Sequence, residues 1–320
     1  AEIKIDTDRI RGKVNRNIYG NFIEHLGRCI YGGIYDEESP LSDKKNIRQD
    51  VLEAAKDLNI PHLRWPGGNF VSGYHWMDGI GPVEERPNKQ ELAWDTVETN
   101  KFGTDEYMEY CELLDAEPHL CVNMGNGTME EAQSWVEYCN ADTDTKYANL
   151  RRKYGQEEPY NVKYWGLGNE IYGEWQIGHK NVHDYVKAAK EFGKVMKRVD
   201  PSIKLIACGA GTPEWDRVVV EELGGLVDYI STHMYVGNPD NDYYDYMATS
   251  EKVERRLEML EGIINSVMHD VAPSERPKIA FDEWNVWYRT HPDPGEDPSY
   301  ETRHILEEHY NQEDALVVAM

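Results

Sequence analysis

The sequence predicts an α/β protein built as a (β/α)8 barrel, and two observations favour this fold. Short apolar segments alternate with longer amphipathic ones, which is the pattern of strands and helices around a parallel sheet. Polar and aromatic residues also follow the end of nearly every predicted strand. A barrel builds its site from many strand ends, whereas a doubly wound sheet gathers its site at one switch point. The distribution along this chain therefore favours the barrel.

The predicted elements follow in order from the N-terminus. An opening ribbon (EIKI, then GKV) precedes seven candidate strands at residues 18–25, 61–68, 118–125, 162–170, 203–211, 227–235 and 277–285. Helical patterns lie at residues 42–58, 104–114, 128–139, 182–199, 213–223, 250–269 and 300–320. Seven strands are one short of a closed barrel, so we expect residues 15–320 to form a barrel that lacks its eighth strand. The missing strand is expected in another chain, in a portion removed by cleavage, or in a part of the protein outside this sequence.

Composition excludes several classes of partner. Acidic residues outnumber basic ones 59 to 34, which gives a formal net charge of −25 that is spread along the chain. Such a surface repels phosphate backbones and anionic lipid, so we expect neither nucleic acid nor a membrane as a partner. The N-terminal stretch has no apolar signal-like region, and the five cysteines form no CxxC pair. We therefore expect reduced thiols and a cytoplasmic location.

The segment WGLGNE, residues 165–170, gives the strongest local signal for chemistry. Its glycines allow a backbone or ligand to approach closely, and Asn169 can orient a hydroxyl. Glu170 is near Trp165 and Trp175 in the sequence, so we expect partial desolvation to raise the pKa of its carboxyl. A carboxyl with a raised pKa stays protonated near neutral pH and serves as a general acid. The alternative is a strand-end glutamate exposed to solvent.

A second acidic segment, IAFDEWNVWY, places Asp282 and Glu283 between an apolar strand and aromatic residues. Strand alternation sends the two carboxyls to opposite faces, so we expect only one of them to point into the barrel. Two carboxyls at one rim, one from each segment, are the minimal machinery of glycoside hydrolysis. Indole rings stack on sugar faces, and we expect Trp287 to contact the substrate. The alternative is a pair of solvated charges at the rim.

Other polar residues at strand ends fit a pocket for a polyol. Arg64 can anchor a carboxylate or order the acidic pair, Asn69 lies in a Gly-rich turn, and Glu24 can accept sugar hydroxyls. Tyr235 and His233 can hydrogen-bond the attacking carboxylate and lower its pKa. A single histidine at a strand end is more often structural than catalytic, so this alternative stays open for His233.

Other chemistries match the sequence less well. Barrel metal hydrolases use several histidines together, usually with an HxH pair at the end of the first strand, where this chain has Glu24 and His25. The sequence contains no GxSxG, no GxxxxGK[ST] and no GxGxxG after a strand. Serine hydrolase, P-loop and dinucleotide-binding functions therefore lack support.

Five ordered segments resemble the α-L-arabinofuranosidases of glycoside hydrolase family 51. They are NIYGNFIEHLGRCIYGGIYD, RWPGGNFVSGYHW, YWGLGNE, STHMYVGN and FDEWNVWY, and the resemblance extends over essentially the whole chain. It implies a (β/α)8 barrel with an acid/base after Asn at the end of strand four and a nucleophile at the end of strand seven. Glu170 and Glu283 occupy these positions. The resemblance also implies a furanose pocket lined by Glu24, Arg64, Asn69, Trp94, Asn169 and Tyr235.

The resemblance implies a retaining, exo-acting double displacement on terminal α-L-arabinofuranosyl groups of arabinan, arabinoxylan or their oligosaccharides. Glu283 would attack the anomeric carbon and Glu170 would protonate the leaving oxygen, with the two carboxyls about 5 Å apart. No metal or organic cofactor is implied. Two alternatives stay open: an endo-β-1,4-glucanase or xylanase of the same clan, and a sugar-binding but inactive fragment.

The resemblance also implies parts outside this sequence. Family members carry a C-terminal β-sandwich, and we expect residues 1–14 to contribute a strand to it. The C-terminal part of the protein that this sequence lacks is a candidate partner in the form of a separate chain. The family's eighth strand supplies a Gln to the sugar pocket. A homo-hexamer is implied as well. The segment IYGEW after Glu170, where the family often has Asp and Pro, is expected to alter the rim that receives the leaving group.

Overall fold

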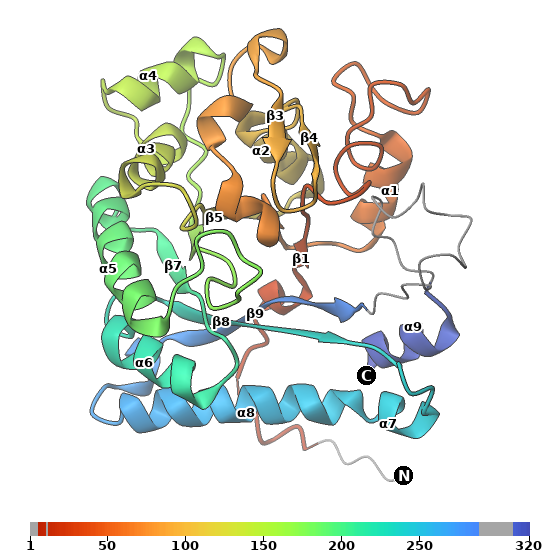
Figure 1. The fold of residues 1–320 in the computed structure, drawn as a ribbon, viewed down its shortest axis with the longest axis vertical. Coiled ribbons are helices and arrows are strands. Elements are labelled where there is room, and N and C mark those ends of the chain that lie inside the picture. The colour runs from red at the N-terminus through yellow and green to blue at the C-terminus, as the bar shows by residue number, and fades with distance from the viewer. Residues whose placement is uncertain (1–5, 11, 288–309) are drawn as a thin grey trace.

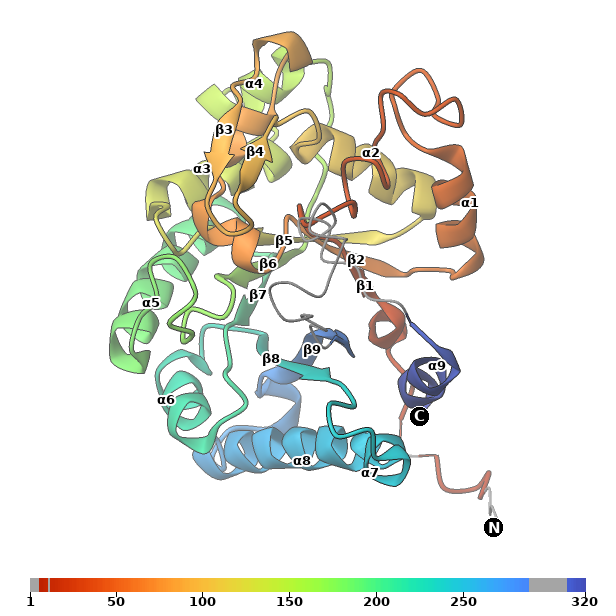
Figure 2. The same ribbon diagram turned by 45° about the vertical axis from the view of Figure 1, so that its right-hand side comes forward.

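The strands form an incomplete barrel in the computed structural model, which describes residues 6–10, 12–287 and 310–320 (Figure 1). Seven strands make one parallel sheet in the order β1-β2-β5-β6-β7-β8-β9. Their bounds are Asn21–Phe22 (β1), His62–Trp65 (β2), Glu117–Val122 (β5), Tyr164–Leu167 (β6), Lys204–Ala207 (β7), Tyr229–Val236 (β8) and Lys278–Val286 (β9). The sheet curls until it is nearly closed, with β1 and β9 as its two edges (Figure 2). The predicted seven strands are confirmed, although the first is reduced to two residues.

Helices cover the outside of the sheet (Figure 2). They are α1 Gln49–Asp57, α2 Thr104–Leu114, α3 Met129–Asn140, α4 Lys146–Lys153, α5 Val182–Val199, α6 Pro213–Leu223, α7 Tyr243–Met247, α8 Thr249–Val267 and α9 Gln312–Ala319. Helices α2, α5 and α6 have the predicted bounds. The Asn181 side chain accepts the Asp184 N–H at the start of α5, which is the capping contact that an N-terminal Asn predicts.

Several elements have no counterpart in the sequence prediction. Helix α4 buries only Ala148 and Arg151, so it lacks the apolar stripe on which helix prediction depends. The hairpin of β3 (Lys89–Glu91) and β4 (Thr96–Glu98) has strands of three residues, too short for a clear alternation. Residues 2–5 of the expected ribbon and residues 300–309 of the last predicted helix lie outside the described residues, and residues 12–14 have no regular secondary structure. Pairing of the ribbon with a β-sandwich therefore stays a prediction.

The core between the sheet and its helices contains a cluster of aromatic rings. Trp135 stacks parallel to Trp76 at 6.0 Å between ring centroids, and it meets Trp65 and Trp165 edge to face. All four indoles are buried. The expectation that Trp165 lies beside Glu170 is wrong, because its side chain points into this core and its indole N–H donates to the Val162 carbonyl oxygen.

The pairing of β8 with β9 contains an irregularity that reaches the site. Ser231 pairs with Ala280, and the next paired residue on β8, His233, is opposite Glu283. Strand β9 therefore has one more residue than β8 across this interval, which is the geometry of a β-bulge. A bulge interrupts the alternation of side chains, and it is here that Asp282 and Glu283 lie.

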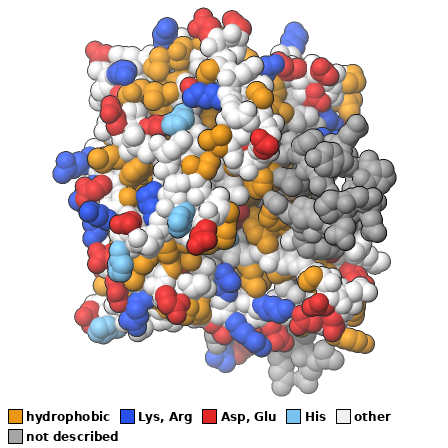
Figure 3. All heavy atoms as spheres, in the orientation of Figure 1, with side chains coloured by type: hydrophobic (Ala, Val, Ile, Leu, Met, Phe, Trp, Pro, Cys, Tyr) orange, Lys and Arg blue, Asp and Glu red, His pale blue; other side chains and the backbone are white. Residues whose placement is uncertain are grey.

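The surface carries both signs of charge. Figure 3 shows acidic and basic side chains interspersed over one face, with neither sign gathered into a single block. In the described parts of the chain, no helix combines the length and apolar character needed to span a bilayer.

Candidate active site

Most of the ten predicted site residues lie in or just after the strands β1, β2, β6, β8 and β9. Trp94 lies in the turn that joins β3 to β4. Eight of them line one cavity of about 1670 Å³, which also continues between β1 and β9. These eight are Glu24, Arg64, Asn69, Trp94, Glu170, Tyr235, Glu283 and Trp287. The other two, Asn169 and His233, are buried and bond to residues of the same cavity wall. The barrel therefore brings together at one rim the side chains that the sequence separates.

Glu283 is buried at the end of β9 and is held at both carboxylate oxygens. The guanidinium of Arg64 donates to Oε2 at 2.7 Å, and the hydroxyl of Tyr235 donates to Oε1 at 2.7 Å. Arg64 is itself 3% exposed, so this ion pair is shielded from water. The contacts fix the carboxylate in one orientation, as positioning of a nucleophile requires.

Arg64 also orients Asn169. Its Nη2 donates to Asn169 Oδ1 at 2.5 Å, while the amide Nδ2 of Asn169 is buried and has no hydrogen-bond partner among the described residues. A Cβ built on Gly68 would lie 3.3 Å from both carboxylate oxygens of Glu283 and 3.4 Å from that Nδ2. Only glycine leaves this space open, and a free amide donor beside the carboxylate can bind a sugar hydroxyl.

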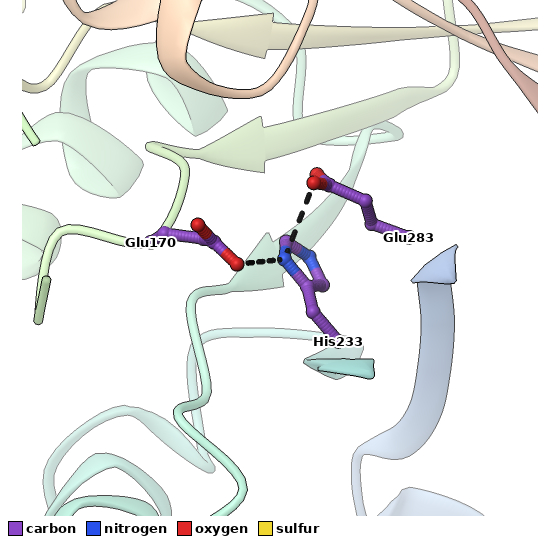
Figure 4. Close-up of side chains that lie close together, drawn as sticks. All are labelled: Glu170, His233 and Glu283. Carbon is purple, nitrogen blue, oxygen red and sulfur yellow. Dashed lines mark hydrogen bonds and ion pairs between the residues drawn. The ribbon is translucent and has the colours of Figure 1, made fainter. Parts of the chain in front are cut away.

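Glu170 follows β6 in a left-handed backbone conformation, with φ of 42°. Tyr172 donates its hydroxyl to Oε1 at 3.1 Å, and the indole N–H of Trp175 donates to Oε2 at 3.3 Å. Nδ1 of His233 lies 3.0 Å from Oε1 and 3.5 Å from Oε2 of Glu283, so the ring bridges the two glutamates (Figure 4). A left-handed backbone conformation is strained for a non-glycine residue, and the contacts of Glu170 with its neighbours maintain it.

The pKa of Glu170 differs from the expectation. Burial opposes ionisation of the carboxyl, but the hydrogen bond and charge of His233 outweigh it, so the pKa of Glu170 is lowered. Burial alone would lower the pKa of His233, but the carboxylates around the ring raise it to about 10. The expectation of a raised pKa for Glu170 is therefore wrong, because the desolvation of its carboxyl comes together with an adjacent cation.

Glu24 lines the same cavity. The backbone N–H of Phe70 and the indole N–H of Trp94 both donate to its Oε1, at 3.0 and 3.2 Å. The hydrogen bonds that Glu24 makes with the described residues use Oε1, so Oε2 can accept a sugar hydroxyl. Burial and the charge of Glu283 raise the pKa of Glu24 to about 7.

Two further predicted residues, Asn69 and Trp287, also line the cavity. Asn69 begins the 3-10 helix Asn69–Gly73 directly after the Gly-rich turn and lines the cavity. The indole of Trp287 meets the ring of Tyr235 edge to face at 5.3 Å between centroids. Both residues therefore line the cavity, and their contact with a substrate stays a prediction.

Sequence reasoning missed three contacts to the carboxyls. Asp282 was expected to point away from the barrel if Glu283 points in, but it lies 3.1 Å from Nε2 of His233 and 3.6 Å from Nε of Arg64. The bulge in β9 is the physical reason that both carboxyls reach the same interior. The sequence analysis placed Trp175 near Glu170 only as a source of desolvation. It did not assign the Tyr172 hydroxyl or the Trp175 indole N–H as hydrogen-bond donors to this carboxyl.

One described group of side chains has the spacing of a metal site. Ligand atoms of Glu170, His233 and Glu283 all lie within 4.8 Å of one another. The same atoms already form hydrogen bonds and ion pairs among themselves and with Arg64 and Tyr235. Hydrogen bonds and ion pairs within the protein therefore already occupy the atoms that a cation would need as ligands.

Comparison with known proteins identifies close relatives. The family model of the alpha-L-arabinofuranosidase 1 domain matches residues 54–255. A probable alpha-L-arabinofuranosidase C of Aspergillus fumigatus is 47% identical over 99% of this chain and 64% of its own length. The intracellular exo-alpha-(1->5)-L-arabinofuranosidase 1 of Bacillus subtilis is 43% identical over 99% of this chain and 65% of its own length. The arabinose complex of the alpha-L-arabinofuranosidase from Thermotoga maritima is 53% identical, with a TM-score of 0.87 over 94% of this chain and 60% of that one. This chain thus spans a little under two thirds of the relatives that it matches.

Proposed function

The chain belongs to the α-L-arabinofuranosidases of glycoside hydrolase family 51, and we propose that it is the catalytic portion of a retaining, exo-acting enzyme of that activity. Its substrates are terminal α-L-arabinofuranosyl groups on arabinan, arabinoxylan or their oligosaccharides. The names of the Bacillus subtilis and Thermotoga maritima relatives, one an exo-α-1,5-arabinofuranosidase and one bound to arabinose, support this substrate class.

The observation that carries the proposal is the placement of Glu170 and Glu283. They face one another at the rim of the barrel, and an oxygen of each lies within 4.8 Å of the other. Retaining glycosidases place their two carboxyls ~5–5.5 Å apart, whereas inverting enzymes need a wider gap for a water molecule. The narrow spacing supports a covalent intermediate.

The roles follow from the surroundings of each carboxyl. Glu283, fixed by Arg64 and Tyr235, attacks the anomeric carbon and forms a glycosyl ester. Glu170, nearer the open rim, delivers a proton to the departing oxygen and later takes one from the water that releases arabinose. Asn169 and Glu24 bind sugar hydroxyls through the Nδ2 and Oε2 atoms that their protein contacts leave available. We assign Asn69, Trp94 and Trp287 to the pocket wall.

Two variants test the assignment. Glu283→Ala should abolish cleavage for every leaving group. Glu170→Ala should mainly slow deglycosylation when the substrate is 2,4-dinitrophenyl α-L-arabinofuranoside, whose leaving group needs no proton, and azide should restore the rate in this variant alone. Glu53→Ala, at an exposed position on α1, is the control and should keep full activity. Equal losses in both active-site variants on the activated substrate would contradict the roles.

The products separate the remaining alternatives. Release of single arabinose residues, formed first as the α anomer, supports the exo-acting retaining enzyme. Internal cuts in glucan or xylan would identify an endo-acting enzyme, and calorimetric binding of arabinose without turnover would identify an inactive sugar-binding protein.

We also propose a cytoplasmic location and a hexameric assembly that includes the remaining C-terminal part of the protein. The word intracellular in the name of the Bacillus subtilis relative supports the location. Light scattering of the purified protein measures the assembly, and a monomer would contradict it.

A further inference from the structure

His233 is surrounded by carboxylates on both ring nitrogens. Nε2 lies 3.1 Å from Asp282 Oδ1, and Nδ1 lies 3.0 Å from Glu170 Oε1 and 3.5 Å from Glu283 Oε2. A neutral imidazole carries one N–H, so it cannot donate to Asp282 and Glu170 at the same time. The arrangement therefore contains a shared proton, held either by the ring or by Glu170.

The surrounding charges determine where that proton rests. The titratable and charged groups around His233 are Glu170 from the loop after β6, Asp282 and Glu283 from β9, Arg64 from β2 on two of these carboxylates, and Arg256 from α8 on the backbone oxygen of His233. Cys208, after β7, interacts with Glu170 and Asp282. Three carboxylates face the ring directly, and Arg64 pairs with two of them. The net field around the ring is negative, so the imidazolium is favoured, and the protonated ring in turn lowers the pKa of Glu170.

This resting state has the wrong protonation for the first chemical step. A general acid must carry a proton before the leaving oxygen departs, yet the resting Glu170 is a carboxylate. The proton is one hydrogen bond away, on Nδ1 of His233. Figure 4 shows the ring placed between the two glutamates.

Building on the proposed function, we propose that Asp282 and His233 form a proton relay to Glu170, in which His233 stores the catalytic proton and Asp282 holds the ring in the orientation for its transfer. Asp282 is suited to this role because its partners among the described residues are His233 and Arg64, and neither glutamate contacts it directly. It is a positioning residue, since it acts through His233.

The proton count balances over the cycle. In glycosylation the Nδ1–H bond of His233 breaks as an O–H bond forms on Glu170. That proton then passes to the leaving oxygen as the bond between this oxygen and the anomeric carbon breaks and Glu283 bonds to the same carbon. In deglycosylation Glu170 accepts a proton from water, the hydroxide attacks the anomeric carbon, Glu283 leaves as a carboxylate, and the proton returns to Nδ1. His233 is neutral only while the glycosyl ester exists.

The geometry also explains the timing of transfer. Glu283 is 3.5 Å from Nδ1, and its negative charge helps to hold the proton on the ring. As Glu283 bonds to the sugar, this charge disappears and the proton is released toward Glu170. A sugar in the cavity excludes water, and an ion pair is then less favourable than the neutral pair of the same two groups. Attack and proton delivery are thereby coupled through one ring.

Asp282→Asn tests the relay because it keeps the size of the side chain and removes the charge. We expect kcat/KM for an arabino-oligosaccharide, whose leaving group needs a proton, to fall about 100-fold. For 2,4-dinitrophenyl α-L-arabinofuranoside the loss should stay below about fivefold, because this leaving group needs no acid. In the pH profile of kcat/KM for the oligosaccharide, the fall in activity on the alkaline side should occur at a lower pH than in the wild type. At pH 8 His233 of the variant should give the NMR signals of a neutral ring, whereas His233 of the wild type gives those of an imidazolium.

Tyr235→Phe is the matched control. It removes one hydrogen bond from Glu283 and none from Glu170, so it should slow both substrates by the same factor. His233→Gln, which can still donate to Glu170 but has no proton to transfer, should repeat the leaving-group dependence of Asp282→Asn, and it replaces that variant if the latter does not fold.

Each failure has a distinct signature. Equal losses of Asp282→Asn on both substrates, or an unchanged imidazolium signal, would overturn the relay and leave the function intact. Absence of arabinose release by the wild type would instead overturn the proposed function.

Discussion

Replacement of Glu24 by Gln should remove a pH dependence from the stability of the fold. Glu24 is 6% exposed, and burial together with the charge of Glu283 raises its pKa from the usual 4.5 to about 7. The folded protein then binds this proton more tightly than the unfolded chain does. The resulting stabilisation is fully present below pH 4.5 and is lost as the pH rises through 7.

The magnitude follows from the shift. At ~1.4 kcal/mol per pH unit, the interval from 4.5 to about 7 corresponds to about 3 kcal/mol of unfolding free energy. Glu24→Gln keeps an oxygen that can accept from Phe70 and Trp94 but cannot ionise. Relative to the wild type, the variant should therefore gain about 3 kcal/mol between pH 4.5 and pH 8.5.

Urea denaturation of both proteins at the two pH values measures this difference, and groups that titrate in both cancel. Glu53→Gln, at an exposed position on α1, is the matched control for removal of one carboxylate from the protein. The predicted pH dependence is refuted if the difference in unfolding free energy between Glu24→Gln and the wild type is the same at the two pH values within about 1 kcal/mol. It is also refuted if the wild type gains stability relative to the variant at the higher pH.

Three other predictions follow from single positions. Gly68→Ala places a methyl group 3.3 Å from both carboxylate oxygens of Glu283, so kcat/KM should fall at least tenfold, which corresponds to ~1.4 kcal/mol or more of transition-state stabilisation. The free energy of unfolding in urea should change by less than about 1 kcal/mol. A larger loss of stability than of activity would contradict this prediction. In urea denaturation the free energy of unfolding of Glu170→Gly should be about 1 kcal/mol higher than that of Glu170→Ala, because a φ of 42° costs a non-glycine residue about that much. Equal stability of the two variants would contradict backbone strain at this position. Burial lowers the pKa of His62 from 6.5 to about 4, so the unfolding free energy should fall by about 3 kcal/mol as the pH falls between these two values. The variant His62→Gln should not show this loss. Acid unfolding curves of the variant and the wild type that run parallel would contradict the prediction.

The sequence predicts the barrel well because its local signals agree with its tertiary contacts. Apolar runs that end in polar residues became strands of one sheet, and Asn181 capped α5 as its residue type indicates. Helix α4 escaped prediction because its burial depends on two residues, one of them Arg151, whose guanidinium donates to the backbone oxygens of Tyr138 and Ala141. Such contacts exist only after the fold has formed.

The sequence indicates which side chains converge at one rim better than it indicates their electrostatics. Residues at strand ends converge in any barrel, so Glu170 and Glu283 could be placed at one rim from the sequence. The position of Asp282 depends on a bulge, which strand alternation cannot anticipate. The pKa of Glu170 depends on a histidine 63 positions away in the chain. Both errors concern long-range geometry rather than residue type.

The tryptophans offer two separate optical signals for this protein. Trp65, Trp76, Trp135 and Trp165 are shielded within the core, whereas Trp175 and Trp284 are 63% and 45% exposed. Acrylamide should therefore quench only part of the emission of the native protein. An arabinose titration should perturb the accessible fraction through Trp175, beside Glu170, while the red shift of the shielded fraction marks loss of the core. Emission can thus distinguish a ligand-bound site from a melting barrel in a single sample.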